Sequence, residues 1–252
     1  MSPHVVGVIQ ARMGSTRLPG KVLLEIEGKP MLGHVVHRVR RASSIDEVVV
    51  ATSTDEADEK IANYCATQHI PHIRGEKKDV LARTMRAAKD MHADIVVRVT
   101  GDCPLMDPEV IDKTVHAFLE LYPAIDFGSN RGSTELRRTY PIGLDVEVMS
   151  IEALFRANKE AEKEYQREHV TPYLYEKLGR FRTMSVDSGG SYGDLRWAVD
   201  TPEDLKFVRR VYELLAEKSD FGWRDVLDLL AEIPELKTIN ANVLQKNMSE
   251  AE

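Results

Sequence analysis

Residues 5–21 read VVGVIQARMGSTRLPGK and join a short apolar run to a loop rich in glycine, hydroxyl and cationic side chains. The run at 5–9 has the length and continuity of a strand buried on both faces. The loop that follows holds three cations, two glycines and two hydroxyl groups. Ligands bind open α/β sheets at the carboxyl ends of strands, where a glycine-containing turn exposes N–H groups to phosphate oxygens. We therefore predict a loop that binds a triphosphate, with a solvated surface loop as the alternative.

The loop departs from both common phosphate-binding patterns. Five residues separate Gly14 from Gly20, and Lys21 is followed by Val22 instead of Ser or Thr, so the P-loop spacing is absent. The GxGxxG pattern of dinucleotide-binding folds is absent as well. The chemistry of the loop, and not a match to either pattern, carries the prediction.

Strand and helix patterns alternate along the first half of the chain. Short apolar runs predict strands, and apolar residues at helical spacing predict the helices between them. This alternation indicates an α/β fold with a mainly parallel, doubly wound sheet that carries helices on both faces. The predicted strands are residues 5–9, 47–51, 71–74 and 95–99, and the predicted helices are residues 34–42, 56–67, 79–90 and 108–121.

The pattern changes between residues 124 and 186, where alternating polarity at 144–148 indicates antiparallel strands and long loops. We interpret this segment as a smaller lobe inserted into a single domain that spans residues 1–252. The chain then returns with a predicted strand at 195–199, whose alternate residues share one face. Predicted helices follow at 201–215 and 221–233, and the polar tail at 247–252 is expected to fray.

Composition excludes several classes of protein. The chain has 34 Lys and Arg against 41 Asp and Glu, a net charge of −7, which excludes a basic nucleic-acid-binding surface. No apolar run approaches the roughly 20 residues that span a bilayer, and the first ten residues lack the features of a signal peptide. We therefore expect a cytoplasmic protein that binds neither membrane nor nucleic acid. An acidic protein that binds a polyphosphate needs cations gathered locally, aided by a divalent metal.

Two aspartates follow predicted strands at distant points of the chain. Asp102 comes after the strand at 95–99, and Asp200 comes after the strand at 195–199. Mg²⁺ is commonly held by one or two carboxylates together with waters and substrate phosphates. These two aspartates therefore predict a Mg²⁺ site beside the cationic loop. The alternatives are a turn-forming role for Asp102 and a helix N-cap role for Asp200, with Glu203 completing a capping box.

Weaker candidates lie in three other segments. Asp79 and Arg83 belong to the stretch 74–83, which would line a nucleotide base or ribose, although Asp79 is equally suited to cap a helix. Asp145 and Glu147 alternate on one predicted strand face, where they would hold sugar hydroxyls or simply face solvent. His169 would contact an anionic substrate or be a buried structural histidine.

Three segments together resemble the cytidylyltransferases that activate sugar acids, which include the CMP-sialic acid and CMP-KDO synthetases. They are ARMGSTRLPGK at 11–21, GDCPL at 101–105 and VDTPEDL at 199–205. The segments PIGLDVEV at 141–148 and EHVTPY at 168–173 resemble the spore-coat polysaccharide biosynthesis protein F type within that family.

The resemblance implies a three-layer α/β/α sandwich of the nucleotide-diphospho-sugar transferase type and a homodimer that uses the smaller lobe. It implies Mg²⁺-dependent transfer of CMP from CTP to a sugar acid, with release of pyrophosphate, for surface polysaccharide synthesis. The catalytic residues would be Arg12, Lys21, Asp102 and Asp200, with the two aspartates as metal ligands. The nucleotide-binding residues would be Ala11, Arg12, Gly14, Ser15, Arg17, Lys21, Asp79, Arg83 and Asp102, and the substrate-binding residues Asp145, Glu147 and His169.

Departures from the family pattern leave the acceptor open. Members that activate KDO usually have an acidic residue where Cys103 stands, and the sialic acid enzymes have a different segment around the second metal aspartate. Transfer to a sugar-1-phosphate, a phosphonate or a small alcohol is one alternative. A non-catalytic nucleotide-binding or glycosyltransferase-like protein is another. No residue is assigned as a general base.

Overall fold

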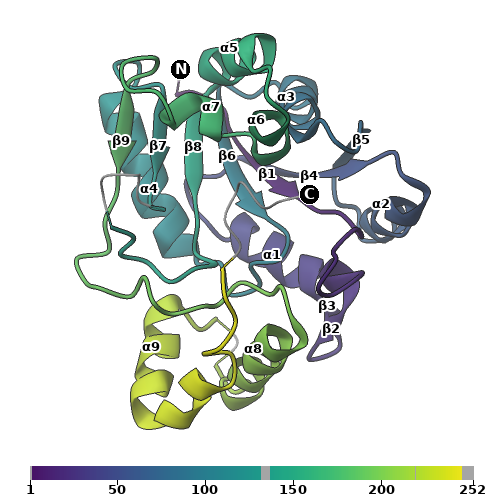
Figure 1. The fold of residues 1–252 in the computed structure, drawn as a ribbon, viewed down its shortest axis with the longest axis vertical. Helices are drawn as coiled ribbons and strands as arrows, with labels where there is room; N and C mark the ends of the chain where they lie inside the picture. Colours follow the sequence, from purple (N-terminus) through teal and green to yellow (C-terminus); the bar gives the residue numbers. More distant parts are fainter. Residues whose placement is uncertain (1, 132–136, 219, 246–252) are drawn as a thin grey trace.

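One central sheet of seven strands dominates the computed structural model, which describes residues 2–131, 137–218 and 220–245 (Figure 1). The strand order is β5-β4-β1-β6-β8-β7-β9. The strands from β5 to β6 are parallel, whereas β8 runs antiparallel to both β6 and β7. The predicted mainly parallel α/β sheet is therefore confirmed. The strands are β1 (Val5–Gln10), β4 (Glu47–Ser53), β5 (His72–Gly75), β6 (Ile95–Thr100), β7 (Phe127–Ser129), β8 (Glu147–Ser150) and β9 (Thr183–Ser185), and a separate hairpin holds β2 (Glu25–Ile26) and β3 (Lys29–Pro30).

Helices cover both faces of the sheet because the inner strands are apolar on both sides. In β1, Val5 and Ile9 join one core cluster, whereas Val6 and Val8 join the other. A strand buried on two faces has a continuous apolar sequence, which is the pattern seen at 5–9. The first cluster is covered by α1 (Met31–Arg40), α2 (Glu59–Thr67) and α4 (Pro108–Leu121), and the second by α3 (Val80–Asp90), α5 (Ile151–Glu160) and α7 (Pro172–Tyr175). Helix α6 (Glu164–His169) packs on α3.

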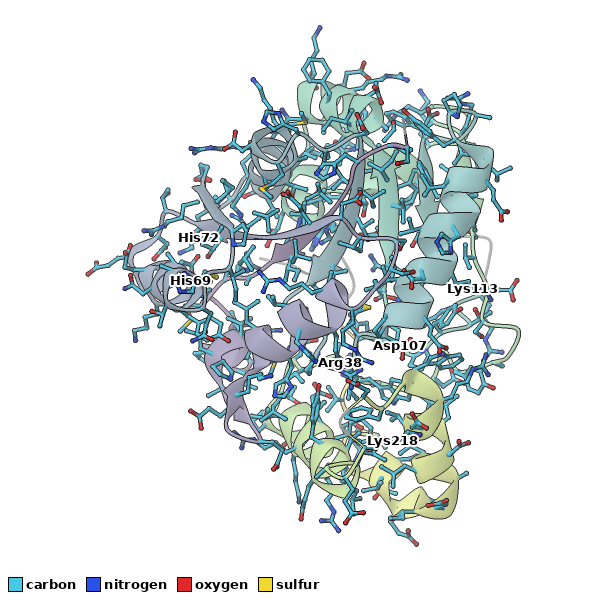
Figure 2. The ribbon with its side chains drawn as sticks, turned by 180° about the vertical axis from the view of Figure 1, so that it is seen from behind. Arg38, His69, His72, Asp107, Lys113 and Lys218 are labelled. Carbon is cyan, nitrogen blue, oxygen red and sulfur yellow. The ribbon has the colours of Figure 1, made fainter. Side chains whose placement is uncertain are left out.

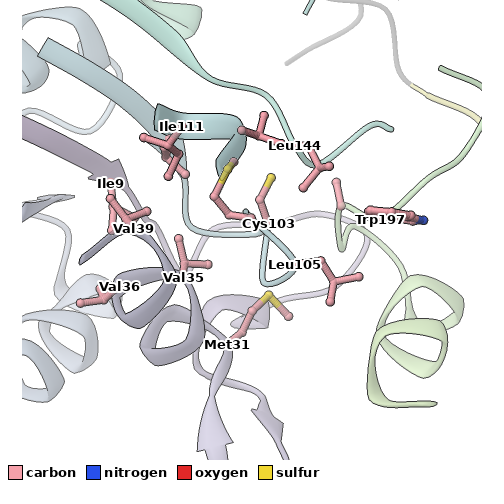
Figure 3. Packing of buried hydrophobic residues seen from close by; sticks show 14 of the residues in the cluster. Ile9, Met31, Val35, Val36, Val39, Cys103, Leu105, Ile111, Leu144 and Trp197 are labelled. Carbon is pink, nitrogen blue, oxygen red and sulfur yellow. The ribbon is translucent and has the colours of Figure 1, made fainter. Parts of the chain in front are cut away.

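Helix α1 shows how local spacing produces the packing between layers. Val35, Val36 and Val39 lie on one side of the helix and are buried in the cluster that also holds Ile9 (Figure 3). Each buried side chain of this size stabilises the fold by roughly 1.5–3 kcal/mol relative to an exposed one. The apolar stripe predicted from the sequence therefore anchors α1 to the sheet below the cationic loop.

The segment 124–186 continues the central sheet. Its strands β7, β8 and β9 join the edge of β6, so in the described residues they form no sheet of their own. The predicted antiparallel pairing is present, although β8 begins only at Glu147. A role for this segment in dimer formation stays a prediction. Residues 132–136 and the tail at 247–252 lie outside the described residues.

The strand predicted at 195–199 is wrong. Only an isolated parallel bridge between Ile142 and Arg196 is present there. Strand β6 is paired with β1 on one side and with β8 on the other. This segment therefore crosses the carboxyl ends of the strands instead of joining the sheet. Gly143 makes the crossing possible, because its φ is +107° and a Cβ atom would lie 2.5 Å from the backbone nitrogen of Ala198. The backbone N–H of Val199 then donates to the carbonyl of Asp102 at 2.9 Å.

The C-terminal helices α8 (Pro202–Leu214) and α9 (Trp223–Glu232) lie together at one end of the molecule (Figure 1). Two buried polar side chains fix them to the sheet layers. Arg38 donates to the carbonyls of Met106 and Phe221, and Asp107 accepts from the backbone N–H of Trp223 at 2.6 Å. Figure 2 shows Arg38 and Asp107 at this junction. None of the described helices is long and apolar enough to cross a membrane.

Candidate active site

The loop after β1 closes on itself at the carboxyl edge of the sheet. The backbone N–H of Gly20 donates to the carbonyl of Met13 at 3.0 Å, and the Ser15 hydroxyl accepts from the N–H of Leu18 at 3.3 Å. Gly20 has a φ of +70°, a conformation that glycine adopts without the steric cost of a side chain. These contacts fold the loop tightly and bring Lys21 back over the end of the strand.

A buried carboxylate that the sequence analysis did not select holds the loop in place. Asp58 is 2% exposed, and it accepts from the backbone N–H of Met13 at 2.6 Å and from the hydroxyl of Ser53. Asp58 ends the 3-10 helix η2 (Glu56–Asp58), so the loop is tied to the segment after β4. In the sequence, Asp58 lies among other charged residues of the predicted helix 56–67, and nothing there distinguishes it from a surface charge.

Lys21 joins the two aspartates that were predicted to meet. Its Nζ lies 2.6 Å from Asp102 Oδ2 and 2.7 Å from Asp200 Oδ1, and it also donates to the carbonyl of Val199 at 2.8 Å. Asp102 follows β6, and Asp200 follows the segment that crosses the strand ends. The predicted convergence of the two carboxylates is therefore present, with the ammonium group between them.

Charge pairing keeps this cluster ionised. Burial by itself lowers the pKa of Lys21, but Asp102 and Asp200 outweigh it and the pKa is raised. Burial by itself raises the pKa of Asp102, but the Lys21 ammonium outweighs it and the pKa falls to about 2. At neutral pH the cluster therefore presents one ammonium and an ionised Asp102 to the cavity.

The second oxygen of Asp200 is bound by two guanidinium groups. Arg17 Nη2 lies 2.9 Å from Asp200 Oδ2, and Arg196 pairs with the same oxygen. The N-cap of α8 is Thr201, and Asp204 completes its capping box, so the capping role considered for Asp200 with Glu203 is wrong. Because Thr201 and Asp204 cap the helix, the side chain of Asp200 pairs with Lys21 and Arg17 instead.

These residues open onto a cavity of about 590 Å³ at the carboxyl ends of β1 and β6. The predicted residues that line it are Ala11, Arg12, Gly14, Ser15, Arg17, Lys21, Arg83, Asp102, His169 and Asp200. The other lining residues include Gln10, Thr16, Val22, Lys77, Val80, Arg98, Thr100, Gly101 and Glu168. Lys77 and Val80 belong to the stretch 74–83 that was expected to line a base or ribose. Arg98 was missed, although a charge inside the apolar run at 95–99 was a usable signal.

Three predicted residues do not line the cavity. Asp79 caps α3 by accepting from Ala82 at 2.9 Å, and it pairs with Arg167 at 2.6 Å. Asp145 precedes β8 and pairs with Arg138. The structure contradicts the prediction that Asp145 and Glu147 share an open strand face. That prediction failed because β8 starts at Glu147, which is 2% exposed and faces the sheet interior.

Arg83 forms the wall of the cavity on the side of α3. It is 3% exposed, and its Nη1 donates to the carbonyl of Glu76 at 2.9 Å. Burial lowers its pKa, and within the described residues its Nε has no hydrogen-bond partner. A buried guanidinium group in this position suits a ligand that supplies oxygen or nitrogen acceptors.

A family model described as cytidylyltransferase matches residues 6–248. The chain belongs to the cytidylyltransferase family. This cytidylyltransferase is 29% identical over 241 residues to the spore coat polysaccharide biosynthesis protein SpsF of Bacillus subtilis, across 93% of this chain and 97% of that protein. The predicted family resemblance is therefore confirmed.

Solved structures agree with this assignment. A cytidylyltransferase from Leptospira borgpetersenii is 29% identical, covers 97% of this chain and 100% of its own, and has a TM-score of 0.87. The structure of CMP:2-keto-3-deoxy-manno-octonic acid synthetase complexed with CTP shares the fold, with a TM-score of 0.63 at 23% identity over 84% of this chain and 99% of its own. By its family, this cytidylyltransferase is a nucleotidyltransferase.

Proposed function

We propose that this cytidylyltransferase transfers CMP from CTP to a sugar acid, with release of pyrophosphate and with the help of Mg²⁺. The observation that carries the proposal is the convergence of Lys21, Asp102 and Asp200 beside the cationic loop at the mouth of the cavity. In this reaction the oxygen of an acceptor hydroxyl bonds to the α-phosphorus of CTP. The bond between that phosphorus and the oxygen that bridges the α- and β-phosphates breaks. Negative charge then builds on the pyrophosphate leaving group.

The cations of the loop are placed to stabilise that charge. Lys21 is nearly buried, so its charge acts with little screening by water. Arg12 is exposed and pairs with Glu168 at 3.1 Å, and Arg17 pairs with Asp200. These ion pairs hold the three side chains around the cavity before a nucleotide arrives. Preorganised cations of this kind stabilise developing charge without reorganising during the reaction.

The carboxylates fit a Mg²⁺ ion. Asp102 and Asp200 would hold it, because both direct an oxygen at the one point that Lys21 Nζ contacts. Within the described residues no group of three or more His, Cys, Asp or Glu surrounds a single point. Phosphate oxygens and water would therefore complete the oxygen coordination that Mg²⁺ prefers. The ion would add Lewis-acid stabilisation of the phosphate charge, and Lys21 would move from the carboxylates towards the phosphates.

The acceptor class rests on the relatives. The Bacillus subtilis relative is named for spore coat polysaccharide biosynthesis, and the synthetase with the shared fold is named for 2-keto-3-deoxy-manno-octonic acid. A sugar acid destined for a surface polysaccharide agrees with both names. It also agrees with the surplus of cations around the cavity.

The decisive experiment measures pyrophosphate release with CTP, UTP, ATP and GTP, with Mg²⁺ present or chelated. The acceptors are KDO, nonulosonic acids, sugar-1-phosphates, phosphonates and small alcohols. We expect release that requires CTP, Mg²⁺ and a sugar acid. Release with a sugar-1-phosphate, phosphonate or alcohol instead would contradict the acceptor class, and CTP binding without release from any acceptor would support a binding protein.

Asp102→Ala tests the roles of the site residues in the same assay. We expect turnover to fall by at least about 10²-fold, because the carboxylate is placed to hold the ion at the reacting phosphate. Glu120→Ala, which removes an exposed carboxylate of α4, is the matched control and should keep wild-type turnover. Full CTP turnover by Asp102→Ala would exclude the proposed mechanism.

A further inference from the structure

Arg98 lines the cavity and has no role in the nucleotide chemistry described above. It lies on β6 directly opposite Glu147 of β8, and its side chain is 12% exposed. Its Nε donates to Gln10 Oε1 at 2.9 Å, and its Nη1 pairs with Glu147. These bonds use two of the five N–H groups of a guanidinium. Nη2 makes no hydrogen bond with any described residue, although Arg98 lines the cavity.

An ion pair with Glu147 fixes this guanidinium group. One carboxylate oxygen pairs with Arg98, and the other accepts from the hydroxyl of Thr171 at 2.7 Å. Burial by itself raises the pKa of Glu147, but the charges of Arg98 and Arg131 outweigh it and the pKa is lowered. Glu147 is therefore ionised inside the sheet layer, where it fixes the orientation of Arg98.

Arginines outnumber carboxylates in the group of charges around Glu147. Arg98 and Arg131 both act on Glu147, and Arg138 pairs with Asp145. Three guanidinium groups thus share two carboxylates. Of this group Arg98 lines the cavity, together with Glu168 and His169.

In the sheet, Arg98 lies on the opposite side of β1 from β4 and β5, on which α3 packs. The phosphate loop follows β1, and the Arg83 wall belongs to α3, which packs on β5, β4 and β1. Arg98 and Glu147 pair across β6 and β8, on the other side of β1 in the sheet. A nucleotide held by the loop and by Arg83 would leave the β6–β8 side for the second substrate.

A strained turn follows α6, which packs on α3, and leads the chain to Thr171. Val170 has a φ of +69°, a value that a β-branched residue rarely adopts. The N–H of Thr171 donates to the carbonyl of His169 at 2.8 Å and closes the turn. Thr171 is thereby placed against Glu147, and His169 lines the cavity. Strained backbone of this kind concentrates at ligand-binding sites.

We propose that Arg98 binds the carboxylate of the acceptor, and that Glu147 and Thr171 position its guanidinium for that contact. The inference rests on the proposed function and adds the residue that selects an acid over a neutral sugar. The fork of a guanidinium matches a carboxylate in a bidentate contact that an ammonium group cannot reproduce. Arg98 is therefore a specificity-determining residue for the acceptor.

The test compares a sugar acid with its methyl ester, because the ester removes the charge and keeps the sugar. KDO and N-acetylneuraminic acid, each with its methyl ester, are assayed by pyrophosphate release with wild type and with Arg98→Lys and Arg98→Met. We expect wild type to favour an acid over its ester by at least tenfold in kcat/KM. In Arg98→Met this preference should disappear while the KM for CTP stays within about twofold, and Arg98→Lys should keep only part of it.

Folding is controlled separately. Arg98→Met removes the guanidinium that pairs with buried Glu147. The double variant Arg98→Met, Glu147→Gln removes both charges of this pair and should show the same loss of acid preference. Arg86→Met, which removes an exposed arginine of α3, is the matched control and should keep the wild-type preference.

Binding of the acids and esters is also measured by calorimetry with a non-hydrolysable CTP analogue present. An unchanged acid preference in Arg98→Met, or a loss of CTP affinity with unchanged acceptor affinity, would overturn the assignment of Arg98. Failure of wild type to bind any of the acids would overturn it as well. Binding of an acid that depends on Arg98 without pyrophosphate release would overturn the proposed reaction and leave the subsite standing.

Discussion

Asp58 shows how one buried side chain shapes the site from outside the cavity. One oxygen accepts from the N–H of Met13 and the other from the hydroxyl of Ser53, so the start of the cationic loop is fixed to the end of β4. A buried acceptor satisfied in this way stabilises the loop in a single conformation. The proposed binding of a triphosphate by Arg12, Arg17 and Lys21 depends on that conformation.

Asp58→Asn should therefore weaken nucleotide binding. The amide replaces one acceptor oxygen by a donor that faces the donors of Ser53, which we expect to cost about 1–3 kcal/mol of unfolding free energy. Calorimetric titration with CTP should show a loss of affinity of about tenfold. Without the Asp58 carboxylate, the loop of the variant must become ordered when CTP binds, which costs conformational entropy. Asp90→Asn, an exposed change at the end of α3, should alter neither value. Wild-type CTP affinity in Asp58→Asn would show that the loop does not need this anchor.

At the scale of elements, α4 begins at a cap that also binds another helix. Asp107 Oδ1 accepts from the N–H groups of Glu109 and Val110, at 2.9 and 3.2 Å. Its Oδ2 accepts from the N–H of Trp223 at the start of α9. One carboxylate thus satisfies unpaired donors at two helix N-termini, where negative charge is also favoured by the helix dipoles.

Asp107→Ala should destabilise the protein more than the loss of an ordinary cap. The cap contributes about 1 kcal/mol, and the buried N–H of Trp223 would be left without its acceptor, at a further cost of about 1–3 kcal/mol. Chemical denaturation should show a loss of about 2–4 kcal/mol. Asp225→Ala is the comparison, because Asp225 is the N3 residue of α9 and its side chain accepts from Gly222 on the same helix terminus. An equal loss in both variants would contradict the double role of Asp107.

For the whole molecule, stability depends on how the C-terminal helices dock onto the sheet layers. Arg38 lies 4.2 Å from the ring centroid of Phe221 and donates to Tyr212, while His34 of α1 lies 4.5 Å from the ring centroid of Tyr212. The His34 Nε2 lies 2.8 Å from the carbonyl of Ile26. Burial lowers the pKa of His34 from 6.5 to about 4, so this junction contains a neutral imidazole at neutral pH.

The junction predicts a pH dependence of stability. His34 is neutral in the folded protein and regains its ordinary pKa on unfolding, so the unfolded chain binds more protons between pH 6.5 and pH 4. Stability should therefore be fully present above pH 6.5 and fall as the pH drops through this window. We expect His34 to account for about 1–2 kcal/mol of that loss, because its partly exposed ring is screened by solvent.

Urea denaturation at pH 7.5, 5.5 and 4.5 measures this effect. His34→Gln should show a flatter dependence than wild type, whereas His116→Gln, which changes an exposed histidine of α4, should follow wild type. His37, whose pKa burial also lowers, titrates in all three proteins and so cancels in the comparison. Identical slopes for His34→Gln and wild type would exclude His34 as the source.

Local chemistry in the sequence determined the alternating α/β elements, the cationic loop and the two aspartates, because each depends on residues that are neighbours along the chain. The run at 5–9 shows this, since burial on both faces is visible in its composition. The meeting of Asp102 and Asp200 was predicted from two strand ends, but only Asp102 follows a strand, so the outcome was right and half of its reason was wrong. Only the tertiary structure decided that residues 195–199 cross the strand ends instead of pairing, since β8 had already taken the edge of β6. Only the tertiary structure decided that Glu147 braces Arg98 and that Asp58 anchors the loop, because burial and pairing of a charge depend on residues that are distant along the chain.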